Sequence, residues 1–376
     1  MQNNHKLFTY ICTQWLHSLR LHPTAGLCQV AVCFGVCLLA FTTILFAQTR
    51  PTSESNLEAV AENPVTRQLI VVTGAPGEEA YTGNFRNWSE RWVQASQAGN
   101  IECEWIDGTQ PIDEAAVSEQ ASDKKRLLDL ITKAGDKELW LVLIGHGTFD
   151  GKVSKFNLRG EDITANELEQ ALSIGKGTQV IVNCFSCSGA FLPVLSRPGR
   201  IVITATKSGA EMNYSRFGDF MSLSILDPAA DLDHDHSVSI LEAFLMAAKR
   251  TEQFYMDESR LSTEHPLLED GGDKKGVSAA FFRGIRLVKQ AAEGATIDGE
   301  LAAMTLLNAS KDDASLDGLR AEKRNELELA LRTLRTKKAS LPESEYYTKV
   351  GEIALELASL YDAPLQRSEA AEIRGQ

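Results

Sequence analysis

Short, nearly uninterrupted apolar runs alternate with segments of helical spacing in the middle of the chain. The runs are rich in Val, Ile and Leu, which is typical of strands covered on both faces. They predict strands at 68–73, 101–106, 138–144, 178–183 and 200–206. Helical patterns lie between them at 88–97, 112–134 and 164–172. This alternation predicts βαβ units, and therefore an α/β fold with a mostly parallel sheet and helices on both faces.

The apolar pattern changes beyond about Thr296. Two sets of leucine-rich positions follow at helical spacing. They are Leu327, Leu331 and Leu334, and then Val350, Ile353, Leu357 and Leu360. Ser340 and Pro342 between them indicate a break and a fresh helix start. We therefore expect residues 297–376 to form a helical hairpin, which packs on the rest of the chain or on a sister chain, or docks a protein partner.

The N-terminal region is of a different kind. No charged residue occurs from Gly26 to Ala47, a stretch long enough to cross a bilayer as a helix. Residues 1–47 therefore read as a signal peptide or a transmembrane anchor, and polar residues 48–66 as a linker to an α/β domain at 67–290. Positive charge precedes the apolar stretch and acids follow it, so we expect an exported chain whose body lies on the outer face of the cytoplasmic membrane.

Charge and cysteine content narrow the function. The formal net charge is −13, and an acidic body argues against a nucleic-acid partner, because phosphate binding needs a basic face. Beyond the N-terminal region only Cys103, Cys184 and Cys187 remain. Three cysteines do not make a disulfide framework, so the core must supply the stability.

Candidate chemistry follows two of the predicted strands. One strand ends in Gly145-His146-Gly147, and the next along the chain ends in Cys184-Phe-Ser186-Cys187-Ser-Gly. Ligands of parallel sheets bind outside the carboxyl ends of strands. An imidazole beside a thiol or hydroxyl is the base and nucleophile pair that acyl transfer requires, and amides near Gly147 would be the oxyanion donors.

From about Leu69 to Asp273 the sequence resembles the legumain-like branch of the caspase-fold cysteine peptidases. Those enzymes place a His-Gly after one strand and a Cys-x-Ser-Gly after the next, and His146-Gly147 matches the first motif. Ser188-Gly189 sets the register of the second, so that Ser186 occupies the cysteine position. The resemblance implies a caspase-like three-layer sandwich, a peptide or protein substrate and no organic cofactor. Asparagine specificity does not carry over, because its pocket residues have no match here.

Several interpretations of the second motif remain open. Cys184 is the nucleophile if the turn holds a two-residue insertion, and its place directly after the apolar run favours this. Ser186 is a serine nucleophile activated by His146, or Cys187 takes the role. The alternative is a catalytically degenerate domain that binds or scaffolds other proteins. The C-x-x-C spacing also admits a redox pair, although the strand before it is not thioredoxin-like.

A second constellation has the spacing of a calcium loop. Acids stand at positions 1, 3, 5 and 12 of an EF-hand pattern, with serines at 7 and 9. The predicted metal set is Asp231, Asp233, Asp235, Ser237, Ser239 and Glu242. His236 replaces the usual glycine at position 6, and Pro228 interrupts the incoming helix. The alternative is that these acids cap the N-terminus of the following helix, where the macrodipole favours them.

One further histidine stands near acidic residues. His265 lies close in sequence to Asp270 and Asp273, so it is a candidate for a site at the sheet's edge or a loop histidine.

Overall fold

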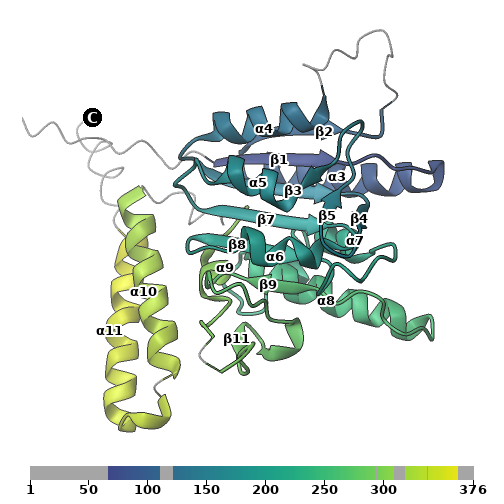
Figure 1. The fold of residues 1–376 in the computed structure, drawn as a ribbon. Helices are drawn as coiled ribbons and strands as arrows, with labels where there is room; N and C mark the ends of the chain where they lie inside the picture. The colour runs from purple at the N-terminus through teal and green to yellow at the C-terminus, as the bar shows by residue number, and fades with distance from the viewer. Residues whose placement is uncertain (1–66, 111–121, 294, 309–317, 337, 363–376) are drawn as a thin grey trace, which may run out of the picture. The chain divides into compact units, whose positions relative to one another are not determined.

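The computed structural model describes residues 67–110, 122–293, 295–308, 318–336 and 338–362 (Figure 1). Contacts divide the chain into two units, Met1–Ala61 and Glu62–Gln376, and every described residue belongs to the second. The expected signal peptide or anchor at 1–47 and the expected linker at 48–66 lie outside the described residues. Within the described ranges, no helix is long and apolar enough to cross a membrane.

A six-stranded sheet forms the centre, in the order β2-β1-β3-β7-β8-β9. The first five strands are mutually parallel, and β9 pairs antiparallel to β8 at the edge. The strands are β1 (Arg67–Thr73), β2 (Glu102–Asp107), β3 (Glu138–Ile144), β7 (Gln179–Cys184), β8 (Arg200–Thr204) and β9 (Leu267–Glu269). In β1, β3, β7 and β8 the near-continuous apolar sequence has a simple cause: the side chains of both faces are buried, whereas β2 at the sheet edge is mostly half-buried.

Helices cover both faces and divide the core into two clusters. Alternate residues of one strand enter different clusters: Leu69 and Val71 one, Ile70 and Val72 the other. Each such side chain, fully buried, stabilises the fold by roughly 1.5–3 kcal/mol relative to an exposed one. The first face carries α3 (Glu79–Ala98), α7 (Phe217–Ser224), α8 (Ile240–Asp257) and α9 (Glu300–Met304); the second carries α4 (Asp123–Ala134), α5 (Ala165–Leu172) and α6 (Leu192–Leu195). The α/β sandwich with a mostly parallel sheet is thus confirmed.

Smaller elements decorate the sheet's carboxyl edge and the region after β9. β4 (Gly147–Phe149), β5 (Ser154–Phe156) and β6 (Ile163–Thr164) form a small antiparallel sheet, and β10 (Phe282–Arg283) pairs with β11 (Arg286–Leu287). The single-turn 3-10 helices are η2 (Ser188–Ala190), η3 (Pro228–Ala230), η4 (Ala279–Phe281) and η6 (Lys338–Ser340).

The predicted C-terminal hairpin is present at 318–362, whereas α9, which lies within the region predicted for the hairpin, packs in the first core cluster. α10 (Gly318–Thr336) and α11 (Glu343–Asp362) contact each other, and the break between them falls where Ser340 and Pro342 predicted it. Leu327 and Leu334 of α10 and Tyr346 of α11 are buried. Tyr347 and Leu355 of α11 are exposed, at 53% and 74%.

Candidate functional site

The candidate site lies at the sheet edge where β3 and β7 end. β3 pairs with β7 so that Ile144 stands opposite Cys184, which places His146 and Ser186 at matching positions two residues further on. The Gly147 amide donates a hydrogen bond to Ser186 Oγ at 3.2 Å, and this bond joins the two strand ends directly. The fold thus brings together His146, Gly147 and Ser186, as expected from strands that end at one edge.

An aromatic enclosure surrounds the His146 ring. Tyr81 and Phe85 of α3 meet it edge to face, with ring centroids 4.7 and 5.0 Å away, and Tyr214 lies at 6.1 Å. The imidazole Nε2 is 3.2 Å from the Pro76 carbonyl oxygen. The ring is therefore held by aromatic packing and by one backbone contact, and it is half-buried.

The surroundings of the ring determine its charge and which of its two nitrogens carries the proton. Burial lowers the pKa of His146, although the Pro76 carbonyl and Glu78 act to raise it. The ring is thus predominantly neutral near pH 7. Because a carbonyl oxygen can only accept a hydrogen bond, the contact with Pro76 assigns the proton to Nε2. Nδ1 then keeps the lone pair that a general base needs.

The Ser186 hydroxyl is hydrogen-bonded to backbone groups just beyond the end of β3. Its hydroxyl accepts from the Gly147 amide and lies 3.3 Å from the Gly147 carbonyl oxygen, to which it donates. The side chain is only 3% exposed. In this closed arrangement the Gly147 amide is already bonded, so it becomes an oxyanion donor only after the Ser186 hydroxyl moves.

Cys187 lies in a left-handed turn beside the same glycine. Its φ is +66°, a conformation that L residues adopt at a cost. Its amide donates to the Glu211 carbonyl at 2.8 Å, and its Sγ is 3.8 Å from the Gly147 carbonyl oxygen. Burial raises the pKa of the thiol, against a lowering contribution from Ser186, so the thiolate fraction is small near neutral pH.

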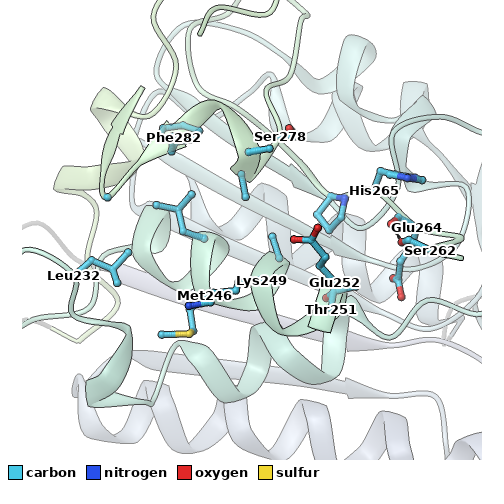
Figure 2. A pocket seen from close by; sticks show the side chains of 16 residues that line it. Leu232, Met246, Lys249, Thr251, Glu252, Ser262, Glu264, His265, Ser278 and Phe282 are labelled. Atoms are coloured by element: carbon cyan, nitrogen blue, oxygen red, sulfur yellow. Dashed lines mark hydrogen bonds between the residues drawn. The ribbon is translucent and has the colours of Figure 1, made fainter. Parts of the chain in front are cut away.

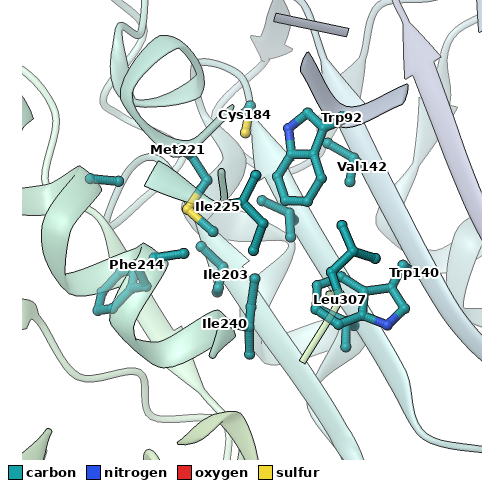
Figure 3. Packing of buried hydrophobic residues seen from close by; sticks show 14 of the residues in the cluster. Trp92, Trp140, Val142, Cys184, Ile203, Met221, Ile225, Ile240, Phe244 and Leu307 are labelled. Carbon is teal, nitrogen blue, oxygen red and sulfur yellow. The ribbon is translucent and has the colours of Figure 1, made fainter. Parts of the chain in front are cut away.

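Cys184 is separated from this group because it points into the core. Figure 3 shows its sulfur among the apolar side chains of the first cluster, near Met221 and Trp92. A Cβ on Gly218 would lie 2.8 Å from the Cys184 Cβ, so α7 covers it closely. Full burial raises the pKa of the thiol strongly. A thiol in this environment is inert toward a peptide, and the geometry does not favour Cys184 as the nucleophile.

Sequence reasoning missed the residues that surround the site. Tyr81 and Tyr214, which enclose His146, and Glu211, which binds the Cys187 amide through its carbonyl, come from α3 and from the loop after β8. That loop has no periodicity, and an aromatic residue within it gives no signal that it meets a histidine about seventy residues away.

His265 binds a different acid from those near it in sequence. Its Nδ1 is 2.5 Å from Glu211 Oε1, and its amide donates to Glu211 Oε2 at 3.2 Å. Asp270 instead accepts the amides of Gly299 and Ala302 at the start of α9. Asp273 accepts those of Lys275 and Thr296. His265 thus joins the loop after β8 to the segment before β9.

His265 also lines a pocket of about 540 Å³ between α8 and the segment around η4. Figure 2 shows Lys249 and Glu252 of α8 on one wall and Ser278 and Phe282 on the other.

The calcium-loop acids divide into two groups. Carboxylate oxygens of Asp231, Asp233 and Asp235 lie within 4.8 Å of one another. Glu242 instead accepts the amides of Leu232, Asp233 and Ser239 and the Ser239 hydroxyl, so it caps α8. Burial, with repulsion from Asp233, raises the pKa of Asp235 to about 6.

The backbone of the same loop turns twice through the left-handed region. His234 and His236 have φ values of +62° and +70°, so His236 adopts the left-handed conformation that glycine usually supplies at position 6. Ser237 and Ser239, also in the predicted metal set, are buried.

No protein-family model and no curated protein sequence matches the chain. The chain is similar to the crystal structure of the Drosophila initiator caspase Dronc, with 14% identity and a TM-score of 0.37, covering 57% of this chain and 82% of that one. It is also similar to caspase-1 from Spodoptera frugiperda, with 9% identity and a TM-score of 0.35, covering 55% and 87%.

Proposed function

We propose that the chain is a legumain-like peptidase-related protein that binds peptide or protein substrates at the edge formed by β3 and β7. His146 is the general base and Ser186 the nucleophile of an acyl transfer. The observation that carries this proposal is the register of β3 and β7, which sets the Ser186 hydroxyl beside the residue that follows a neutral, Nε2-protonated histidine.

The chemical step is a conventional one for such a pair. Ser186 Oγ attacks the scissile carbonyl carbon while its proton moves to His146 Nδ1, and the oxyanion takes the Gly147 amide that the hydroxyl has released. The C–N bond then breaks, and the imidazolium gives its proton to the leaving amine. Water, activated by the same imidazole, hydrolyses the acyl-enzyme. A backbone carbonyl rather than a carboxylate orients the ring, so we expect slow turnover.

The competing function is peptide binding without hydrolysis. Three observations favour it: Ser186 is nearly buried, its hydroxyl occupies the candidate oxyanion amide, and burial raises the pKa of both nearby thiols. In that case the same edge holds a peptide, and the chain acts as a scaffold.

Labelling with electrophiles decides between these functions. The full-length chain, purified in mild detergent with calcium present, is treated with a fluorophosphonate and with a set of peptidyl acyloxymethyl ketones. Adducts are mapped by mass spectrometry. We expect a fluorophosphonate adduct at Ser186 that is reduced at least about 100-fold in His146→Ala, the lower range of a general-base contribution.

The control is His234→Ala, which removes an exposed histidine outside the site. It is expected to label like the wild type. A His146-dependent adduct at Cys187 or Cys184 would assign the nucleophile to that thiol instead. Equal, weak labelling in all variants, with specific peptide binding retained, would leave the non-catalytic function.

Three further proposals accompany this function. Calcium at Asp231, Asp233 and Asp235, with Ser237, Ser239 and Glu242 completing the sequence pattern, is supported by the clustering of the three carboxylates. Export and membrane attachment through residues 26–47 are supported by their uncharged sequence alone. A protein partner on the C-terminal helices is supported by the exposure of Tyr347 and Leu355.

A further inference from the structure

One loop contacts both halves of the candidate site. It runs from Lys207 to Arg216, between β8 and α7, and we name it the β8–α7 loop. Its Glu211 carbonyl accepts the Cys187 amide at 2.8 Å, which ties it to the turn after β7. Its Tyr214 ring lies 6.1 Å from the His146 ring and 4.8 Å from Tyr81, which ties it to the turn after β3. The relative placement of these turns therefore depends on how this loop is held.

Glu264, in the segment before β9, anchors one end of that loop. Its carboxylate accepts the Ser215 hydroxyl at 2.6 Å, the Arg216 amide at 2.9 Å and the Phe217 amide at 3.1 Å. It also accepts the Tyr255 hydroxyl from α8 at 3.1 Å. These donors all converge on a side chain that is only 2% exposed.

The next residue anchors the middle of the loop. His265 contacts the Glu211 carboxylate with its amide and its imidazole, at 3.2 and 2.5 Å. Consecutive residues of one segment thus fix Glu211 within the β8–α7 loop and the end of that loop at Ser215–Arg216, where α7 begins. Tyr214 lies between these two fixed points.

A carboxylate buried to this extent persists only where donors compensate its lost hydration. Burial raises the pKa of Glu264, whereas its bonds to Ser215, Arg216, Phe217 and Tyr255 lower it. The carboxylate and the loop therefore stabilise each other. A neutral amide in its place keeps the side-chain shape but offers one acceptor oxygen instead of two, so some donors lose their partner.

We propose that Glu264 is a positioning residue for the candidate site, which fixes the β8–α7 loop so that Tyr214 packs against His146 and Glu211 holds the turn at Cys187. The inference deepens the proposed function, since it concerns the same site. It does not require that the site hydrolyse peptides.

The test measures His146 directly. Hydrogen exchange at the imidazole Cε1, followed by mass spectrometry across pH, reports the pKa and the solvent access of each of the seven histidines in the full-length chain. In Glu264→Gln we expect the loop to loosen and the ring to gain hydration. The pKa of His146 rises by about half a pH unit, and its exchange is about twofold faster, since burial is what lowers that pKa.

Glu269→Gln is the matched control. It makes the same change in a buried glutamate five residues further on, whose carboxylate accepts the Gly272 and Asp273 amides. It is expected to leave His146 unchanged. Tyr255→Phe removes a single donor to Glu264 and gives a smaller shift in the same direction, which decides the matter if Glu264→Gln does not fold.

An unaltered His146 pKa and exchange rate in a folded Glu264→Gln or Tyr255→Phe protein would overturn the inference. An equal shift in Glu269→Gln would do the same, because the effect would then be general destabilisation. These readouts do not depend on catalysis, so a shift without any electrophile labelling would uphold the positioning role while the peptidase function fails.

Discussion

Among single residues, Gly147 shows how closely the two halves of the site approach. A Cβ there would lie 2.2 Å from the Ser186 carbonyl oxygen and 2.6 Å from Phe185 Cδ2. Its φ is not in the left-handed region, so the requirement for glycine comes from the approach of the neighbouring backbone rather than from its own conformation. Glycine is thus needed after the histidine because only a residue without a Cβ lets the end of β3 pack this closely against the turn that follows β7.

A methyl group at this position tests the closeness of that approach. Gly147→Ala is expected to destabilise the fold by about 1–3 kcal/mol, because a backbone carbonyl must move. Chemical denaturation measures the change. Gly83→Ala in α3, where a Cβ would meet nothing within 4 Å, is expected to stabilise by about 0.5–1 kcal/mol through helix propensity. Equal stability of Gly147→Ala and wild type would refute the close approach.

Single residues also show why the sequence left several candidates for a nucleophile. A strand buried on both faces reads as a continuous apolar run, without the alternation that separates one face from the other. From the sequence, Cys184 was the first residue after the apolar run that could act as a nucleophile. In the structure its side chain points into the core. The parallel register with β3, which sets Ser186 level with His146, is a tertiary feature.

For the elements, the long apolar strands and the C-terminal helices were predictable, and the short or polar-flanked ones were not. The helix expected at 88–97 begins at Glu79 in the structure. Its first turns were not predicted because they carry polar residues on the exposed side. β9 has only three residues, too few for a pattern. The helix expected at 164–172 is present as α5 (Ala165–Leu172), and Thr164 and Glu167 form a capping box at its start with both hydrogen bonds.

The loop before α8 carries the prediction about calcium. Adding calcium to the full-length chain is expected to raise Tm, because an ion bound only by the folded state contributes about 2.7 kcal/mol at a hundredfold excess over Kd. Thermal unfolding with 0 to 5 mM CaCl2 measures this. Asp233→Asn, which removes one of the three clustered carboxylates, should abolish the increase. An unchanged wild-type Tm would mean that these acids serve only as helix caps.

The whole molecule combines two opposite kinds of carboxyl group. Burial raises the pKa of Asp298 to about 7 and that of Asp270 to about 6. Burial also acts to raise the pKa of Glu167, but its bonds to Lys124 and Thr164 prevail and lower it to about 2. A carboxyl group whose pKa is raised by folding stabilises the protein below its unfolded pKa, and this stability is lost as pH rises through the folded pKa. A carboxyl group whose pKa is lowered by folding stabilises the protein above its unfolded pKa, and this stability is lost as pH falls through the folded pKa.

The stability of the whole molecule should therefore be greatest on the acid side of neutrality. Asp298 and Asp270 lose their contribution as pH rises from 3.8, the ordinary pKa of an aspartate, to about 7 and about 6 respectively, and Glu167 loses its own as pH falls from 4.5 to about 2. The pKa of His146 is lowered, so this residue adds stability as pH rises towards 6.5 and opposes the trend set by Asp298 and Asp270 there. We expect Tm to be higher at pH 5.5 than at pH 8 in a calorimetric series from pH 3 to 9.

Asp298→Asn tests the origin of this trend. The amide cannot ionise, so the fall in Tm between pH 6 and 8 should become shallower in this variant. A wild-type Tm that rises steadily from pH 5 to 8 would show that other groups dominate.

The burial of Cys184 and Cys187 has a consequence for oxidative damage. Oxidants and disulfides react with the thiolate form of cysteine. The raised pKa of both thiols keeps the thiolate fraction small, and their burial keeps reagents away. Such thiols persist unmodified in an oxidising medium for as long as the sheet edge stays closed. The rate at which these thiols are converted to sulfenic acid therefore reports how often the end of β7 opens, even when the rest of the chain stays folded.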